Sequence, residues 1–305
     1  MSIFLLLLGK LFPLYALIVL GFLAGRLLDV KREMVARLLL YIIVPAVSFY
    51  GAATVPLNGA VLSLPFVFGA VCITMCALSY ALARMMWKDT TKNILAYACG
   101  TGNNGYFGIP LVIMLFSDSA FGIAVVAGMG FLLYEVTLGF FIVAKGNFTF
   151  AQSVRKLLTL PILYAFLIGL AWNALHIPMP APLNELLLHF RGAFTILGMM
   201  IIGMGFSSLK TLFVDVRFLL VSFFFKFILW PLAILSIVAA DRMFFHLYGD
   251  TVHSVMVVLS MVPLAANTVI FATELKVHPE KAASAVFLST LFALIYIPIL
   301  SALFL

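Results

Sequence analysis

Charged residues are scarce in this chain, and their scarcity excludes most classes of soluble protein. Only 10% of the 305 residues are Asp, Glu, Lys or Arg, 65% are hydrophobic, and the mean hydropathy is +1.22. Average soluble domains carry about 25% charged residues. The net charge of +7 comes from Lys and Arg placed singly or in pairs between apolar segments, so nucleic acid is not an expected partner. We expect an integral membrane protein whose main partner is the lipid bilayer.

Motifs for catalysis and for nucleotide binding are also missing. The chain contains no G-x-x-x-x-G-K-[ST] phosphate loop and none of the motifs H-E-x-x-H, G-x-S-x-G and D-D-x-x-D. The three cysteines lie within or beside apolar segments, and the five histidines show no metal-ligand spacing. We therefore expect no metal, no cofactor and no enzymatic activity, with an intramembrane enzyme as the least favoured alternative.

Apolar segments of membrane-spanning length fill the chain, since a span needs about 20 apolar residues. Ten spans are predicted, at 3–28, 34–54, 61–86, 93–116, 120–144, 158–175, 183–206, 214–239, 252–275 and 282–304. The short connections between them leave no room for a soluble domain. Residues 1–305 are therefore expected to form one all-α, polytopic membrane domain.

Basic residues in the connections are strongly biased to one side of the membrane. One set of alternate connections contains fourteen, namely Arg26, Lys31, Arg32, Arg37, Arg84, Lys88, Lys92, Lys145, Arg155, Lys156, Lys210, Arg217, Lys276 and Lys281. The other set contains only Arg191 and Arg242. Because cytoplasmic loops are enriched in Lys and Arg, the richer set is expected in the cytoplasm. This predicts a protein of the cytoplasmic (inner) membrane with both termini extracytoplasmic.

Two of the predicted spans contain residues that break helices. The fourth holds G-T-G-N-N-G-Y-F-G-I-P at 100–110, and the ninth holds M-V-P-L-A-A-N-T-V-I-F-A at 261–272. An interior glycine costs a helix roughly 1 kcal/mol and a proline about 3. Broken backbone inside a bilayer must be buried in protein or line a polar cavity. Since each half holds an odd number of spans, we predict two inverted five-helix repeats, at about 1–145 and 155–305, with broken helices 4 and 9.

The broken helices form the predicted substrate site. Helix N-termini carry partial positive charge and unpaired N–H groups, which suit an anionic ligand. The candidate substrate-binding residues beside the breaks are Asn103, Asn104, Gly105, Tyr106, Pro110, Pro263, Asn267 and Thr268. The alternative is that these residues serve close helix packing with a tolerated proline kink.

Two charged residues inside predicted spans complete the candidate site. Lys226 lies near the middle of the eighth span, and Glu135 in the fifth span is expected at a similar depth. A charged side chain within a bilayer costs free energy unless it is paired with an opposite charge or hydrated. We predict either a structural Glu135–Lys226 ion pair or a direct role of these two residues in substrate or proton handling, with Lys226 as a substrate-binding residue and Glu135 as a coupling residue.

Three short motifs resemble the auxin efflux carrier family, and in particular its bacterial organic-acid permeases. These are N-N-G-Y-F-G-I-P at 103–110, V-P-L-A-A-N at 262–267 and K-F-I-L-W-P at 226–231. The resemblance implies that spans 1, 2, 6 and 7 form a scaffold and that the other six form a moving transport unit. It further implies that the broken helices cross near Pro110 and Pro263, with substrate beside the crossing.

The expected function is therefore secondary active transport of small organic anions, such as mono- or dicarboxylates, by alternating access. Proton or sodium coupling is expected to drive it. The alternative is a sodium-coupled symporter of bile-acid-like amphipathic anions. The glycine-rich stretch 198–205, G-M-M-I-I-G-M-G, places small residues near helical spacing and can support a homodimer.

Overall fold

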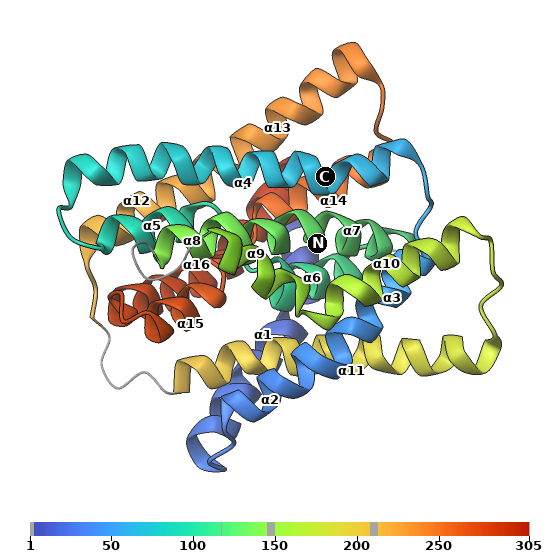
Figure 1. Ribbon diagram of the computed structural model, residues 1–305, viewed down its shortest axis with the longest axis horizontal. Helices are drawn as coiled ribbons and strands as arrows, with labels where there is room; N and C mark the ends of the chain where they lie inside the picture. The colour runs from blue at the N-terminus through green and yellow to red at the C-terminus, as the bar shows by residue number, and fades with distance from the viewer. Residues whose placement is uncertain (1–2, 117, 145–149, 208–212, 305) are drawn as a thin grey trace.

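The computed structural model describes residues 3–116, 118–144, 150–207 and 213–304, and within these ranges the regular structure is entirely helical (Figure 1). The α-helices are α1 Ile3–Leu27, α2 Arg32–Leu38, α3 Val44–Thr54, α4 Gly59–Met86, α5 Thr91–Cys99, α6 Ile109–Leu115, α7 Asp118–Tyr134, α8 Phe140–Val143, α9 Phe150–Leu158, α10 Pro161–Ala174, α11 Ala181–Ser207, α12 Val216–Phe224, α13 Trp230–Ala240, α14 Asp250–Ser260, α15 Asn267–Glu274 and α16 Pro279–Phe304. Five π-helical turns connect or extend them, namely η1 Leu39–Ile43, η2 Asn104–Gly108, η3 Glu135–Gly139, η4 Phe225–Leu229 and η5 Asp241–Phe245.

Seven helical stretches of the described chain are long and apolar enough to cross a membrane. They are Leu5–Leu27, Arg32–Thr54, Gly59–Met86, Ala120–Val143, Ala181–Ser207, Val216–Phe245 and Pro279–Phe304. Two shorter apolar helices, α10 and α14, accompany them. The protein is thus a multi-pass helical membrane protein.

The predicted segments lie on helices whose ends differ by a few residues from the prediction. The largest difference is at the eighth segment, which continues to Phe245 because η5 follows α13 without a break. Sequence reasoning also missed α9, which lies in the connection between the two halves and carries Arg155 and Lys156. Of the basic residues used to orient the chain, Lys145 and Lys210 lie outside the described residues.

The most extensive helix packing pairs α1 with α11, α3 with α10, and α4 with α7. In Figure 1, α4 runs along one side of the molecule and α11 along the opposite side, with α6, α7 and α9 between them. The largest fully buried side chains are aromatic, among them Trp230, Tyr97 and Phe107. Since lipid is as apolar as these side chains, close van der Waals packing rather than exclusion from water must hold the helices together.

Small residues allow α1 and α11 to approach closely. A Cβ atom added at Gly21 would collide with the carbonyl oxygen of Met200, and one at Gly203 with that of Ile18. Gly198 faces Tyr106 within the same chain. The glycine-rich stretch 198–205 is therefore used for packing inside the chain, so the basis given above for a homodimer is wrong. A homodimer itself stays a prediction.

Candidate functional site

The first interruption of helical structure separates α5 from α6. Helix α5 ends at Cys99, residues 101–103 are not helical, and η2 resumes the helix at Asn104 and leads directly into α6. Pro110 lies in α6, inside this continuous helical stretch, and has no N–H group to donate to the preceding turn. The glycines at 100, 102, 105 and 108 weaken helix formation over this stretch, as predicted.

The second interruption separates α14 from α15. Helix α14 ends at Ser260 and α15 begins at Asn267, and residues 262–265 between them carry no regular structure. Pro263 lacks an N–H group and cannot continue a helix. The next backbone N–H, that of Leu264, donates to the Ser289 hydroxyl of α16 at 3.2 Å. A side chain from a neighbouring helix thus satisfies the broken backbone, which the bilayer cannot do.

The two interruptions touch each other. The backbone N–H of Asn103 donates a hydrogen bond to the carbonyl oxygen of Pro263, with an N···O distance of 2.8 Å. This bond joins segments 160 positions apart in the chain (263 − 103). The helical stretches that begin at Asn104 and at Asn267 both start beside this contact.

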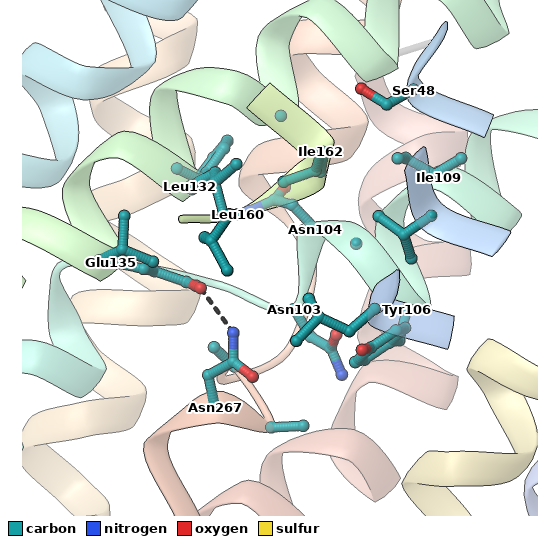
Figure 2. Close-up of a pocket in the computed structure, with 18 of the residues that line it drawn as sticks. Ser48, Asn103, Asn104, Tyr106, Ile109, Leu132, Glu135, Leu160, Ile162 and Asn267 are labelled. Carbon is teal, nitrogen blue, oxygen red and sulfur yellow. Dashed lines mark hydrogen bonds between the residues drawn. The ribbon is translucent and has the colours of Figure 1, made fainter. Parts of the chain in front are cut away.

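A cavity of about 360 Å³ lies against this contact (Figure 2). Both interruptions contribute to its wall, through Asn103, Asn104, Gly105 and Tyr106 on one side and Asn267 on the other. Residues of α2, α3, α7 and α10 complete it, and most of them are apolar. A volume of this size fits a small ligand and falls at the lower end of known ligand pockets.

Four of the predicted substrate-binding residues lie outside the cavity wall: Pro110, Pro263, Thr268 and Lys226. The two prolines act on the backbone, since Pro110 starts α6 and Pro263 supplies the carbonyl oxygen of the contact. The Thr268 side chain is fully buried, and its hydroxyl has no hydrogen-bond partner among the described residues.

Glu135 connects the two interruptions through its side chain. Its Oε1 accepts a hydrogen bond from the Thr101 hydroxyl at 2.7 Å, and its Oε2 accepts one from Asn267 Nδ2 at 2.7 Å. Figure 2 shows the Glu135 and Asn267 side chains pointing toward one another at the cavity. The carboxylate is 6% exposed and belongs to the cavity wall. One acidic group thus holds a residue from each broken stretch.

The predicted ion pair between Glu135 and Lys226 is not formed. The two carboxylate oxygens are occupied by Thr101 and Asn267, and Lys226 Nζ has no hydrogen-bond partner among the described residues. The prediction was wrong because similar depth in the membrane does not bring two side chains together: they must also point toward each other around the helix axes.

Lys226 instead lies behind the first interruption. Its ammonium group is over the Trp230 ring, 4.4 Å from the centroid, in a cation–π contact. A Cβ atom at Gly102 would collide with Lys226 Nζ and would lie 2.8 Å from Val262 Cγ2. Glycine at 102 therefore allows the ammonium group to approach the backbone of the cavity wall. Trp230 Nε1 donates to the Cys99 carbonyl at 2.7 Å and fixes the end of α5 at the same place.

Three buried polar atoms of the cavity wall have no partner among the described residues. They are Asn103 Nδ2, Asn104 Oδ1 and Ser48 Oγ, on residues that are 2–4% exposed. A buried polar group without a hydrogen bond costs about 1–3 kcal/mol, and at a cavity wall water or a polar ligand can supply the missing bond. Sequence reasoning missed Ser48 and Thr101. Thr101 lies inside the quoted motif, whereas nothing in the apolar segment around Ser48 distinguishes it.

Several polar side chains of this region occur on π-helical turns. Asn104 starts η2, Glu135 starts η3, and Lys226 is in η4. Such turns are rare and are frequently found at functional sites, where they rotate the side chains that follow relative to an α-helix. In the part of the chain that is described, no group of three or more His, Cys, Asp or Glu side chains is placed to hold a metal ion.

The fold is that of a helical membrane protein with a cavity between two interrupted helices. A family model described as membrane transport protein matches residues 147–301. The chain therefore belongs to this family, which includes the auxin efflux carriers, and is a membrane transporter. The resemblance noted in the sequence is thus confirmed. No curated protein matches the chain.

Proposed function

We propose that this transporter is a secondary carrier of small organic anions that binds its substrate in the cavity between the two interruptions. The observation that carries the proposal is the set of buried, unpartnered polar atoms on the cavity wall at the contact between Asn103 and Pro263. Their geometry offers a small polar ligand hydrogen bonds that the protein itself leaves unmade. Most of the remaining wall is apolar and suits the carbon skeleton of an organic acid.

Two helix N-termini and one buried lysine near the cavity favour an anion. The helical stretches starting at Asn104 and Asn267 begin at its wall, and a helix N-terminus carries about half a unit of positive charge. Lys226 adds an ammonium group behind Gly102. This group is fully buried, so its field is weakly screened. Lys226 thus acts on the anion through the wall rather than by direct contact.

We propose ten spans in two inverted repeats, about 1–145 and 155–305, within one transporter domain. The three spans beyond the seven long helices are the interrupted stretches 91–115 and 250–274 and the short helix α10. The pairs α1 with α11 and α3 with α10 support a scaffold of spans 1, 2, 6 and 7. Movement of the remaining helices against this scaffold, with the contact of the interruptions kept, gives alternating access.

We also propose that both termini are extracytoplasmic and that the protein lies in the cytoplasmic membrane. The orientation assigns successive connections to opposite sides of the membrane. Contacts between helix ends support this assignment. Lys281 Nζ lies 3.0 Å from Asp215 Oδ2 and 3.1 Å from Thr91 Oγ1, so α5, α12 and α16 start at the same end of the bundle. The Ser63 hydroxyl in the first turns of α4 and the Tyr248 hydroxyl in the connection before α14 are 2.6 Å apart, at the end of the bundle that the charge pattern assigns to the other side.

Uptake into proteoliposomes tests the proposal, with a panel of mono- and dicarboxylates and with proton, sodium and voltage gradients imposed separately. Asn103→Ala removes an unpartnered amide and is expected to raise the half-saturating concentration about tenfold, the equivalent of one hydrogen bond to a charged group. Asn103→Asp should raise it further, because a second negative charge then faces the anion. The melting temperature should change little in Asn103→Ala and should fall in Asn103→Asp, which buries an unpaired carboxylate.

Ser301→Ala is the matched control, since the Ser301 hydroxyl is also buried and unpartnered but lies on α16 outside the cavity wall. Its uptake should equal that of the wild type. Saturable uptake of no carboxylate in the panel would refute the anion class. A lower melting temperature of Asn103→Ala with unchanged affinity would instead assign Asn103 to helix packing.

A further inference from the structure

We infer that the Glu135 carboxylate is the site at which a proton is carried together with the anion, and that its protonation loosens the link between the two interruptions. The inference rests on the proposed function, because it requires an anion in the cavity. The proposed function requires only that an anion binds. The inference adds that a proton compensates the negative charge of the anion, and that the same carboxylate joins the two interruptions.

The charges of the cavity wall explain why binding of an anion favours protonation of Glu135. Within the described residues the wall contains two carboxylates, Glu135 and Glu274, and no Lys or Arg. Glu274 is exposed, whereas Glu135 is buried next to Asn103 and Asn267. An organic anion bound here faces an ionised Glu135 across a low-dielectric cavity, where like charges repel strongly. Protonating Glu135 removes this repulsion, so anion binding and proton binding favour one another.

The hydrogen bonds of Glu135 explain why its protonation loosens the link between the interruptions. In the structure each carboxylate oxygen accepts from a different broken stretch, one from Thr101 and one from Asn267. An ionised carboxylate can accept both bonds, whereas the oxygen that receives a proton becomes a donor. The donor facing that oxygen is then left with a weaker, uncharged acceptor. Protonation therefore weakens one of the two bonds through which Glu135 joins the interruptions.

The surroundings of Glu135 favour a proton over a sodium ion. Thr101 and Asn267 present O–H and N–H donors to the carboxylate, whereas a hard cation needs several oxygen ligands. In the described part of the chain, no group of three or more His, Cys, Asp or Glu side chains is placed to hold a metal ion. The geometry thus matches a hydrogen-bonded carboxyl group.

Other titratable groups near Glu135 do not compete for its oxygens. Tyr97 of α5, Tyr106 of η2 and Cys72 of α4 lie within electrostatic range, and no hydrogen bond joins them to the carboxylate. Lys226 lies behind Gly102, and Arg155 of α9, which packs on η3, is exposed. The proton thus comes from the solution on the side to which the cavity opens, and it leaves with the anion on the other side.

Accumulation of [¹⁴C]-labelled malonate, malate, succinate and lactate in proteoliposomes tests the coupling, with the voltage clamped at zero. For an anion that carries one proton, an inward gradient of one pH unit should give up to about tenfold accumulation. Glu135→Gln should still exchange labelled for unlabelled anion but should show no accumulation under the same gradient. Glu185→Gln, at an exposed carboxylate of α11, is the control and should accumulate as the wild type does.

Amide hydrogen exchange of segments 100–108 and 261–270 tests the structural link without any substrate. After correction for the intrinsic effect of pH, protection in the wild type should fall about tenfold from pH 8 to pH 5, as expected for one lost hydrogen bond to a charged acceptor. In Glu135→Gln the protection should be low and equal at both pH values. Glu185→Gln should follow the wild type.

The possible results separate the two proposals. If no carboxylate is transported, the proposed function fails, and hydrogen exchange still decides whether protonation of Glu135 loosens the interruptions. Accumulation driven by pH in Glu135→Gln would overturn the inference. So would accumulation driven by a sodium gradient at equal pH, which would assign a sodium site, and so would protection in the wild type that is independent of pH.

Discussion

The interruption after α5 and the interruption after α14 differ in what ends the helix. The first contains Gly100 and Gly102, and the space left by their missing side chains is filled by Tyr134 and Lys226 from other helices. The second has no glycine between Met261 and Ala266, and Pro263 lies in the non-helical stretch that follows the end of its helix at Ser260. One break thus depends on what packs against it, whereas the other is fixed by local backbone chemistry.

This difference has a consequence for how each interruption is stabilised. At the first, neighbouring helices supply Tyr134 and Lys226, whose side chains pack against the backbone of Gly100 and Gly102. At the second, a neighbouring helix supplies one hydrogen bond, from the Leu264 N–H to the Ser289 hydroxyl. We therefore expect added volume to damage the first interruption and loss of a polar atom to damage the second.

The largest effect is expected from added volume at the first interruption. In Gly100→Ala the new Cβ collides with the Tyr134 hydroxyl and lies 3.0 Å from Cys76 Cβ. Overpacking of this kind costs about 1–3 kcal/mol, and we expect the upper end because Tyr134 is itself buried. The melting temperature in detergent should fall clearly, and uptake should fall with it.

Gly105→Ala is the matched control for this prediction. Nothing lies within 4 Å of a Cβ atom at Gly105, although the residue belongs to the same motif. Its stability should stay within about 1 kcal/mol of the wild type, the scale of the helix-propensity difference between glycine and alanine. Equal destabilisation by the two substitutions would mean that backbone freedom, not packing, maintains the first interruption.

A smaller effect is expected from the loss of a hydrogen-bond acceptor at the second interruption. Ser289→Ala leaves the buried Leu264 N–H without a partner, which we expect to cost about 1–2 kcal/mol. Thermal melting and hydrogen exchange at residue 264 measure the effect. Ser284→Ala on the same helix removes a buried hydroxyl that has no partner among the described residues, so it should leave stability unchanged or raise it slightly. If both variants melt alike, Ser289 does not support the break.

The smallest effect is expected at the helix ends away from both interruptions. Partial burial acts to raise the pKa of Asp215, but the Phe218 N–H and the Lys281 ammonium group outweigh it and hold that pKa below its usual value. A carboxylate with a lowered pKa adds stability above its unfolded pKa of about 3.9, and that stability is lost as the pH falls below it. The contribution should be below about 1 kcal/mol for a pair this close to the surface.

Melting temperatures between pH 3 and pH 6 check this prediction. As the pH falls from 6 to 3, the melting temperature of Asp215→Asn should fall less than that of the wild type, since the variant has no carboxylate to protonate at this position. Asp250→Asn is the control, because Asp250 is 95% exposed in its pair with Arg242 and should contribute almost nothing. Acid sensitivity that is the same in Asp215→Asn and in the wild type would contradict the prediction.

Helix positions and both interruptions could be predicted because they depend on nearby residues. Runs of apolar residues set the helices, and Gly100, Gly102 and Pro263 mark the places where helical hydrogen bonding stops. Residues 103–106 and Asn267 were identified as site residues for the same reason, and they do line the cavity. The amphipathic helix α9 was missed because it is too short and too polar for a search for spans.

The partners of buried polar groups could not be predicted in the same way. Position along a span gives the depth of a side chain, but its direction around the helix depends on helix rotation and on π-helical turns such as η3 and η4. Glu135 and Lys226 illustrate this limit, since their depths suggested a pair and the structure directs the first to Thr101 and Asn267. Ser48 became a candidate only when α3 was found beside the cavity.

The sequence by itself determined that this protein lies in a membrane, where its helices are, and where two of them break, because hydrophobicity and backbone propensity act over a few residues. Only the tertiary structure decided that the breaks touch through Asn103 and Pro263, that Glu135 joins them, and that Lys226 lies behind Gly102. These contacts join segments far apart in the chain. Their geometry follows from how whole helices pack and rotate against one another, which no local pattern records.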